Sequence, residues 1–421
     1  MKNKIKKMLV VLTVVSTAQA SFAQYNLQQV IVLNEGSWGG PVTVGSYNPS
    51  TKAYQNFDTL QARFATDVII DGGFIYVAAD TLLVKYDLNT KQKLVVQTGK
   101  GIRELAVWKN QLLVTRAEVN PLPSYFQVYD KNTLNFMYEL PTVSERCAEV
   151  KVVNDTAYIA VNGWGSVGKL AVIDLNAQNE NREIDLGPDG VNPENVEVER
   201  GNGKIYTVNS LNFADGSVTK YDVPSSSFVN TRLNRTASCS ASALYLGNIY
   251  FQTSNENKVE VFSTNSLSIW DTLLLNKSVY GMGVDSVNAY MYIGETDYTT
   301  FGKVFIYNLF GALVDSFPVN VSPGTFAFDV RTTTGINENL LSEKFSVYPN
   351  PVTDEIHIFL SGEKNESAEV TLTDIFGRKM EQKQISANST HSISLTKFPT
   401  GVYILSLETR GGIKTRKIVK E

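Results

Sequence analysis

The feature that most restricts how this chain can fold is a short motif that recurs seven times. In each copy an alternating apolar stretch ends in an aromatic residue or Ile, and a polar turn follows. The motif positions are Tyr47, Tyr86, Tyr129, Ile173, Tyr221, Phe262 and Tyr307. Their spacings are 39, 43, 44, 48, 41 and 45 residues. A period near 43 with room for four short strands is typical of a β-propeller.

A second series of strands indicates how the ring closes. Segments similar to residues 74–77 recur in the same order, each preceded by another strand, except that residues 30–33 have no strand before them. Residues 325–330 form the opposite case, a predicted strand with nothing after it. We therefore expect the C-terminal strand to complete the first repeat, so that no innermost edge stays open. The predicted fold is all-β, a seven-bladed β-propeller over residues 24–331 followed by a small β-sandwich.

The placement of rare residues excludes several kinds of chemistry from the main body. Both histidines, His357 and His391, lie in the last 65 of the 421 residues. A Ser-His-Asp triad, a His-ligated zinc or a His general base in residues 1–331 is thereby excluded. Residues 24–344 contain 24 Lys and Arg against 33 Asp and Glu, a net charge of −9. A body this acidic does not suit nucleic-acid binding.

The ends of the chain predict export. Residues 1–23 have a basic start, a short apolar stretch and a cleavage site after Ala23, which is the pattern of a signal peptide. No other apolar run reaches about 18 residues, so we expect no membrane span. Residues 332–344 are the predicted linker to the C-terminal domain. Cys147 and Cys239 fall in repeats that are not neighbours, so we expect two thiols and no disulfide.

Long loops on one predicted rim are the expected binding site. In an antiparallel blade, the loop entering the innermost strand and the loop between strands two and three share a rim. Aromatic and amide side chains in these loops suit a large, flat ligand with polar edges, such as a cobamide, haem or a glycan. The predicted ligand-binding residues are Asn34, Glu35, Trp38, Arg116, Tyr125, Asn162, Trp164, Asn209, Phe213, Asn255, Tyr280, Glu295 and Tyr298. Alternatively, some of the aromatic side chains fill gaps between blades.

Three carboxylates form a second candidate site. Equivalent positions on consecutive inner strands are occupied by Asp67, Glu104 and Glu149. They could hold a divalent cation or act as acid and base, which makes a carboxylate-dependent, metal-assisted hydrolase or lyase the alternative function. The favoured interpretation is structural, with each acid neutralised by an arginine a few residues upstream: Arg63, Arg103 and Arg146. We assign no catalytic residue and no required cofactor, and a protein-interaction scaffold stays open as a third function.

The last 77 residues carry a combination of motifs. Tyr348-Pro349-Asn350-Pro351 opens the segment, Gly377 lies within its middle motif, Gly401 and Tyr403 follow later, and the end is basic. In this combination, residues 345–421 closely resemble the type A sorting domain of proteins exported by the type IX secretion system. The resemblance implies passage across the outer membrane, with the secretion machinery as partner, and release or attachment at the cell surface.

The body resembles a second family. The segment Leu33-Asn34-Glu35-Gly36, with Tyr47-Asn48-Pro49 after it, is similar to the opening of YncE or YVTN-repeat propellers found on bacterial surfaces. Some members of that group bind cobamides. The resemblance implies a secreted or surface-exposed ligand-binding protein that uses its loop-rich rim. We expect it to be monomeric and without enzymatic activity.

Overall fold

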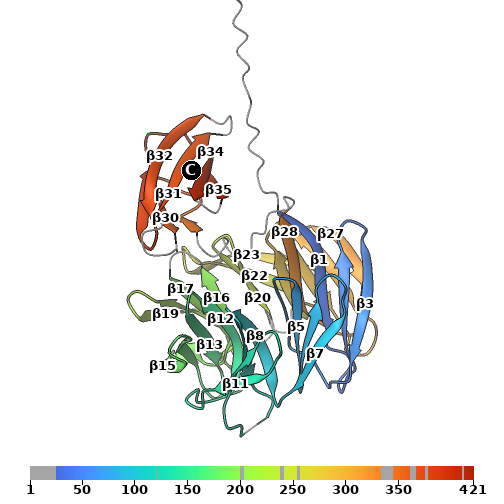
Figure 1. The fold of residues 1–421 in the computed structure, drawn as a ribbon. Coiled ribbons are helices and arrows are strands. Elements are labelled where there is room, and N and C mark those ends of the chain that lie inside the picture. Colours follow the sequence, from blue (N-terminus) through green and yellow to red (C-terminus); the bar gives the residue numbers. More distant parts are fainter. Residues whose placement is uncertain are drawn as a thin grey trace, which may run out of the picture.

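The computed structural model is built almost entirely from β-strands (Figure 1). It describes residues 25–119, 121–199, 203–237, 241–253, 257–332, 345–360, 367–374, 378–409 and 412–421. These residues contain no α-helix, and the two 3₁₀ turns they include, Pro188–Gly190 and Leu211–Phe213, lie in connecting loops. The all-β prediction is confirmed.

Seven four-stranded antiparallel sheets make up the body, and we number them in chain order. Sheet 1 contains β28 (Pro323–Thr332), β1 (Tyr25–Asn34), β2 (Val42–Asn48) and β3 (Ala53–Leu60); sheet 2 contains β4 (Asp67–Asp71), β5 (Phe74–Ala79), β6 (Leu82–Asp87) and β7 (Lys93–Thr98); sheet 3 contains β8 (Ile102–Trp108), β9 (Gln111–Arg116), β10 (Phe126–Asp130) and β11 (Phe136–Glu139). Sheet 4 contains β12 (Cys147–Val153), β13 (Thr156–Val161), β14 (Lys169–Asp174) and β15 (Asn179–Asp185); sheet 5 contains β16 (Pro193–Glu199), β17 (Lys204–Asn209), β18 (Ser217–Asp222) and β19 (Ser227–Arg232). Sheet 6 contains β20 (Ser242–Tyr245), β21 (Asn248–Gln252), β22 (Lys258–Ser263) and β23 (Ser268–Leu274); sheet 7 contains β24 (Gly281–Asp285), β25 (Tyr290–Glu295), β26 (Lys303–Asn308) and β27 (Leu313–Pro318).

Sheet 1 joins the two ends of the body. Strand β28 pairs antiparallel with β1 along nearly its whole length, from Thr332 opposite Tyr25 to Pro323 opposite Asn34. The expectation that the C-terminal strand completes the first repeat is therefore confirmed. The first strands of successive sheets contact one another in the order β28, β4, β8, β12, β16, β20 and β24, and β24 contacts β28 again. The order of contacts is thus cyclic.

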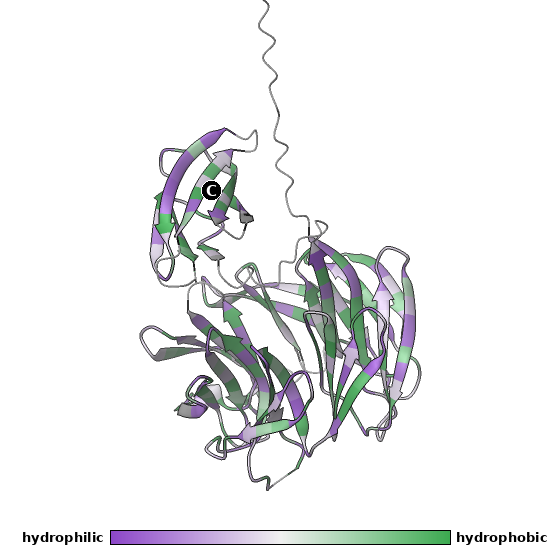
Figure 2. Ribbon diagram, viewed as in Figure 1, coloured by the Kyte–Doolittle hydropathy of each residue, from purple (hydrophilic) through white to green (hydrophobic). Residues whose placement is uncertain are grey.

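The recurring motif is explained by packing between sheets. Each strand points alternate side chains to opposite faces, so Ile75 and Val77 of β5 pack toward sheet 1 while Tyr76 and Ala78 pack toward sheet 3. Figure 2 shows the resulting mixture of apolar and polar residues along the strands. Each of the seven motif residues lies in a different apolar cluster, always toward the preceding sheet. Each repeat thus contributes one large motif side chain to the apolar cluster at its interface, where truncation of such a side chain to Ala typically costs about 2–5 kcal/mol.

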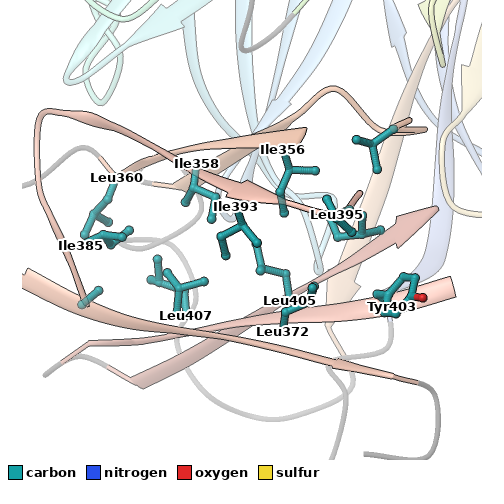
Figure 3. Packing of buried hydrophobic residues seen from close by; sticks show 14 of the residues in the cluster. Ile356, Ile358, Leu360, Leu372, Ile385, Ile393, Leu395, Tyr403, Leu405 and Leu407 are labelled. Carbon is teal, nitrogen blue, oxygen red and sulfur yellow. The ribbon is translucent and has the colours of Figure 1, made fainter. Parts of the chain in front are cut away.

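The C-terminal segment has its own core. Its strands are β29 (Phe345–Tyr348), β30 (Glu355–Leu360), β31 (Ser367–Asp374), β32 (Lys379–Ser386), β33 (Thr390–Ser394), β34 (Gly401–Thr409) and β35 (Gly412–Lys420). They form a three-stranded sheet, β29-β30-β33, and a four-stranded sheet, β32-β31-β34-β35. Side chains from both sheets meet in one apolar cluster (Figure 3), as predicted for a small β-sandwich.

The predicted sorting motif has structural roles in this segment. Asn350, between Pro349 and Pro351, donates from Nδ2 to the Lys417 carbonyl at 2.6 Å and accepts from the Val419 amide at 2.7 Å. It thereby fixes the start of the segment to its last strand. The buried Tyr403 donates from its hydroxyl to the Pro399 carbonyl at 2.6 Å, and Gly401 begins β34.

Several sequence predictions lie outside the described residues. These are the signal peptide, residues 333–344 of the linker, Cys239, Asn255 and Gly377. Cys147, by contrast, is a buried residue at the start of β12. Within the described ranges, no helix is long and apolar enough to cross a bilayer.

Candidate functional site at the loop-rich rim

The two kinds of rim loop are joined by a repeated hydrogen bond. The residue one or two positions before an innermost strand offers its carbonyl to the amide at the end of the second strand or just after it. The Ser322 carbonyl accepts from the Glu35 amide at 2.8 Å, and the Asn192 carbonyl accepts from the Ser210 amide at 3.0 Å. The Gly101 carbonyl accepts from Ala117 at 2.8 Å. These loops therefore lie side by side, and together we call them the rim.

Exposed aromatic side chains gather in rim loops that follow the second strand of a sheet. They are Trp38, Trp164, Phe213, Tyr298 and Phe301. Trp38 is 93% exposed and Trp164 is 55% exposed. Trp164, Phe213 and Tyr298 have φ angles of 57°, 62° and 67°, a left-handed conformation that costs large side chains roughly 1–3 kcal/mol. Strain at three exposed aromatic residues in corresponding loops is a pointer to function.

The first aromatic station consists of Trp38, Tyr298 and Phe301, from the adjacent sheets 1 and 7. Ser322, just before β28, links their loops. Its carbonyl binds the loop that leads to Trp38, and its hydroxyl lies 3.1 Å from the Thr296 hydroxyl, which accepts the Tyr298 amide at 2.8 Å. One buried serine thus holds both loops in position.

The second aromatic station consists of Trp164 and Phe213, from the adjacent sheets 4 and 5. Asn192 has the role that Ser322 has in the first station, since its amide donates to the Val167 carbonyl at 3.0 Å and its carbonyl binds the loop of Phe213. The Arg146 guanidinium lies 5.4 Å from the Trp164 ring centroid. The indole is therefore held between an arginine and solvent.

Charged side chains from three sheets meet beside the stations, in what we call the mouth cluster: Glu35, Arg103, Glu118 and Glu194. Arg103 of sheet 3 pairs with Glu118 at 2.9 Å and with Glu194 of sheet 5 at 3.6 Å. The Asn162 amide donates to Glu194 at 3.2 Å. Sheets 3 and 5 are separated by sheet 4 in the cyclic order, so the ion pair between Arg103 and Glu194 connects two sheets that are not neighbours.

Burial shifts the acid equilibria in the mouth cluster. Desolvation, with a smaller contribution from Glu118, raises the pKa of Glu35 to about 7, although Arg103 opposes the shift. Desolvation likewise raises the pKa of Glu194 to about 7, against the opposing effects of Arg103 and Asn162. Two carboxyl groups here consequently titrate near neutral pH.

Four of the predicted ligand-binding residues have structural contacts beneath the rim loops. Asn34, Arg116, Tyr125 and Asn209 are buried. Asn34, Arg116 and Asn209 are the last residues of β1, β9 and β17, so their side chains lie under the loops instead of in them. Tyr125 packs in the core between sheets 3 and 4.

The hydrogen bonds of these residues show what they support. Asn209 donates to the Ser217 and Thr219 hydroxyls at 2.8 and 2.9 Å. Arg116 donates to the carbonyls of Lys100 and Ser124 at 2.8 and 2.7 Å, which fastens the loop after β9. These donor groups of Arg116 and Asn209 are satisfied by carbonyls and hydroxyls of nearby strands and loops, as is usual for buried polar side chains. The buried side-chain oxygen of Asn34, by contrast, has no hydrogen-bond partner among the described residues.

The other predicted residues that the structure describes lie at the rim. Tyr280 is half-buried and packs edge-on against Tyr298, with ring centroids 5.4 Å apart. Glu295 is paired with Lys277 at 3.6 Å. Asn162 is buried, and its side-chain oxygen accepts the Trp164 amide at 3.1 Å. These residues position the aromatic loops.

The inner-strand carboxylates join neighbouring sheets. Asp67 of β4 accepts the Leu105 amide of β8 at 2.9 Å, and Glu149 of β12 accepts the Val196 amide of β16 at 2.8 Å. Glu197 accepts from the Ser242 hydroxyl of β20 at 2.6 Å. Desolvation raises the pKa of Asp67 to about 6 and that of Glu197 to about 7.

Lysine supplies the counter-charge for this group, where the sequence analysis favoured arginine. Lys151, two residues after Glu149 on the same face of β12, forms an ion pair with it. Burial lowers the pKa of Lys151, but Glu149, Glu197 and Asp67 outweigh burial and raise it. Burial and the nearby Asp67 raise the pKa of Glu104 well above its usual range.

The upstream arginines bind other acids. Arg63 forms a bidentate ion pair with Asp80, with N–O distances of 2.7 and 2.8 Å. The Arg146 Nε lies 3.8 Å from a carboxylate oxygen of Glu145. The favoured interpretation is therefore corrected for Arg63 and Arg146, whereas the charge of Arg103 does act to lower the pKa of Glu104. In the described part of the chain, no three His, Cys, Asp or Glu side chains are grouped so that they could hold one metal ion.

Sequence reasoning missed several rim residues. Phe301 lies in the same loop as Tyr298 and is more exposed. Asn192 and Ser322 each precede a proline that begins an innermost strand, and both have positive φ angles, of 57° and 58°. The sequence signal that could have identified Asn192 and Ser322 is a polar residue directly before a proline at the start of a predicted inner strand. Nothing in the local sequence connects Glu35, Arg103 and Glu194.

Comparisons with solved structures support the fold of the body. Hydrazine synthase of Kuenenia stuttgartiensis matches with a TM-score of 0.54 and 17% identity, over 64% of this chain and 95% of that one. A functionally unknown protein from Desulfotomaculum acetoxidans matches with a TM-score of 0.55 and 14% identity, over 72% and 98%. The computationally designed Ika8 protein has a TM-score of 0.51 and 12% identity, over 80% and 95%. A search of curated proteins found no match.

The fold defines the body as a β-propeller-like, all-β domain. Residues 346–421 match the family described as the secretion system C-terminal sorting domain. The resemblance drawn from Pro349, Asn350, Pro351, Gly401 and Tyr403 is thus confirmed at the level of this domain. The protein is accordingly a type IX secretion substrate that is located at the cell surface or outside the cell.

Proposed function

We propose that the body is a seven-bladed β-propeller of the YncE-like surface group, and that it captures a ligand on the rim without chemically changing it. The observation that carries the proposal is the set of exposed aromatic residues in corresponding rim loops, three of them in strained conformations. Flat apolar faces next to amide and carboxylate groups suit a large ligand with polar edges. Cobamides, haem and glycans are the candidates.

Binding of these candidates can be measured by calorimetry on the full-length chain. We expect the combined substitution Trp38→Ala and Trp164→Ala to weaken binding at least tenfold, because each ring contributes roughly 1 kcal/mol or more of contact energy. Trp270→Ala is a matched control, since Trp270 is 57% exposed but lies on the outermost strand of sheet 6. Unchanged affinity in the double variant would remove the rim as the binding site.

A further inference from the structure

The mouth cluster carries more negative charge than its own residues neutralise. Arg103 is the one cation among Glu35, Glu118 and Glu194, which leaves a net charge of −2 when all three acids are ionised. The adjacent pairs Arg63–Asp80 and Arg146–Glu145 are each neutral and do not compensate for it. Among the described residues, the half-buried Glu35 carboxylate has no hydrogen-bond or ion-pair partner.

A second, independent group in the same place also lacks a donor. Asn192 is 3% exposed, and its side-chain nitrogen contacts Glu194 and the Ser210 hydroxyl. The oxygen of the same amide has no hydrogen-bond partner in the described part of the chain. A buried, unpaired acceptor costs about 1–3 kcal/mol, so a ligand that donates to it would recover that free energy.

The missing component is therefore a positively charged group with several N–H donors. We propose that the mouth cluster seats an organic cation, an ammonium or guanidinium group of the ligand that the rim captures. This inference rests on the proposed function and names the chemical class of the ligand. A metal ion fits less well, because the Arg103 guanidinium already lies between Glu118 and Glu194. The aromatic stations beside the cluster favour cations as well, through their ring faces.

Butylguanidinium and butylurea are matched probes, because they have the same shape and differ in charge. At pH 8 we expect butylguanidinium to bind at least about tenfold more tightly than butylurea. This is the difference in affinity that one hydrogen bond between charged groups typically makes. The preference should disappear in the double variant Glu35→Gln and Glu194→Gln. Glu369→Gln with Glu381→Gln, in the sorting domain, changes the net charge equally and should leave the preference intact.

The pH dependence gives a test on the unmodified protein. As the pH falls from 8 to 6, Glu35 and Glu194 take up protons, so affinity for butylguanidinium should fall several-fold while that for butylurea stays constant. Equal affinities for the two probes, or a preference that persists in the Glu35 and Glu194 variant, would overturn the inference. If planar ligands still bind and lose affinity in the Trp38 and Trp164 variant, the proposed function survives that failure. If butylguanidinium is preferred and the preference needs Glu35 and Glu194, competition by spermidine or by an arginine-containing peptide identifies the source of the cation.

Discussion

At the scale of single residues, side chains predicted for the same ligand site have different roles at the rim. Asn209 ends β17 and is fully buried, with its amide bonded to two hydroxyls, whereas Trp38 is almost fully exposed. From the sequence, both residues are expected in rim loops as ligand-binding residues. The difference arises because the last residue of a second strand lies beneath the rim loops, where neighbouring strands provide its partners.

This difference predicts opposite effects on stability. Asn209→Ala leaves the Ser217 and Thr219 hydroxyls without a donor in a buried position, so we expect the free energy of unfolding to fall by about 2 kcal/mol. Trp38→Ala should change it by less than about 0.5 kcal/mol, as is usual for exposed positions. Urea unfolding followed by circular dichroism measures both. Equal losses in the two variants would contradict the assignment.

At the scale of elements, β28 decides whether the cyclic order of sheets is complete. It is the first strand of sheet 1 although it comes last in the body, and it also contacts β4 and β24. Without it, β1 would expose a ten-residue edge of mostly buried residues. Unpaired apolar edges of this kind favour aggregation.

Truncation tests the role of this strand. A chain that ends at residue 344 retains β28 and should keep the cooperative unfolding transition of the body. A chain that ends at residue 322 loses β28 and should be aggregated or protease-sensitive. Limited proteolysis with size-exclusion chromatography distinguishes the two. Equal protease resistance of both chains would show that β28 is dispensable.

At the scale of the whole molecule, buried acids connect stability to pH. The pKa values of Asp67, Glu35, Glu194 and Glu197 are raised to about 6 or 7, above those of exposed carboxyls near 4. Between about pH 4 and 7 the folded protein therefore binds more protons than the unfolded chain. The linkage relation then makes stability fall as pH rises through this window.

The thermal midpoint should accordingly decrease between pH 5 and pH 7.5, and calorimetry on the full chain can follow it. Glu194→Gln should flatten the decrease, because an amide of the same shape has no charged form to desolvate. Surface aspartates with lowered pKa values, such as Asp87, change the stability only at pH values below this window. A midpoint that rises steadily from pH 5 to 7.5 would contradict the prediction.

The sequence alone determined the repeat, the all-β class, the contribution of the last strand to the first sheet and the sorting domain. These properties depend on strand alternation, spacing and local motifs, which are visible along the chain. Only the tertiary structure decided that Asn34, Arg116, Tyr125 and Asn209 are buried, and that Lys151 pairs with Glu149. It also brought Glu35, Arg103 and Glu194 together from sheets 1, 3 and 5. Such contacts depend on how the inner ends of distant strands converge, and no local pattern records that convergence.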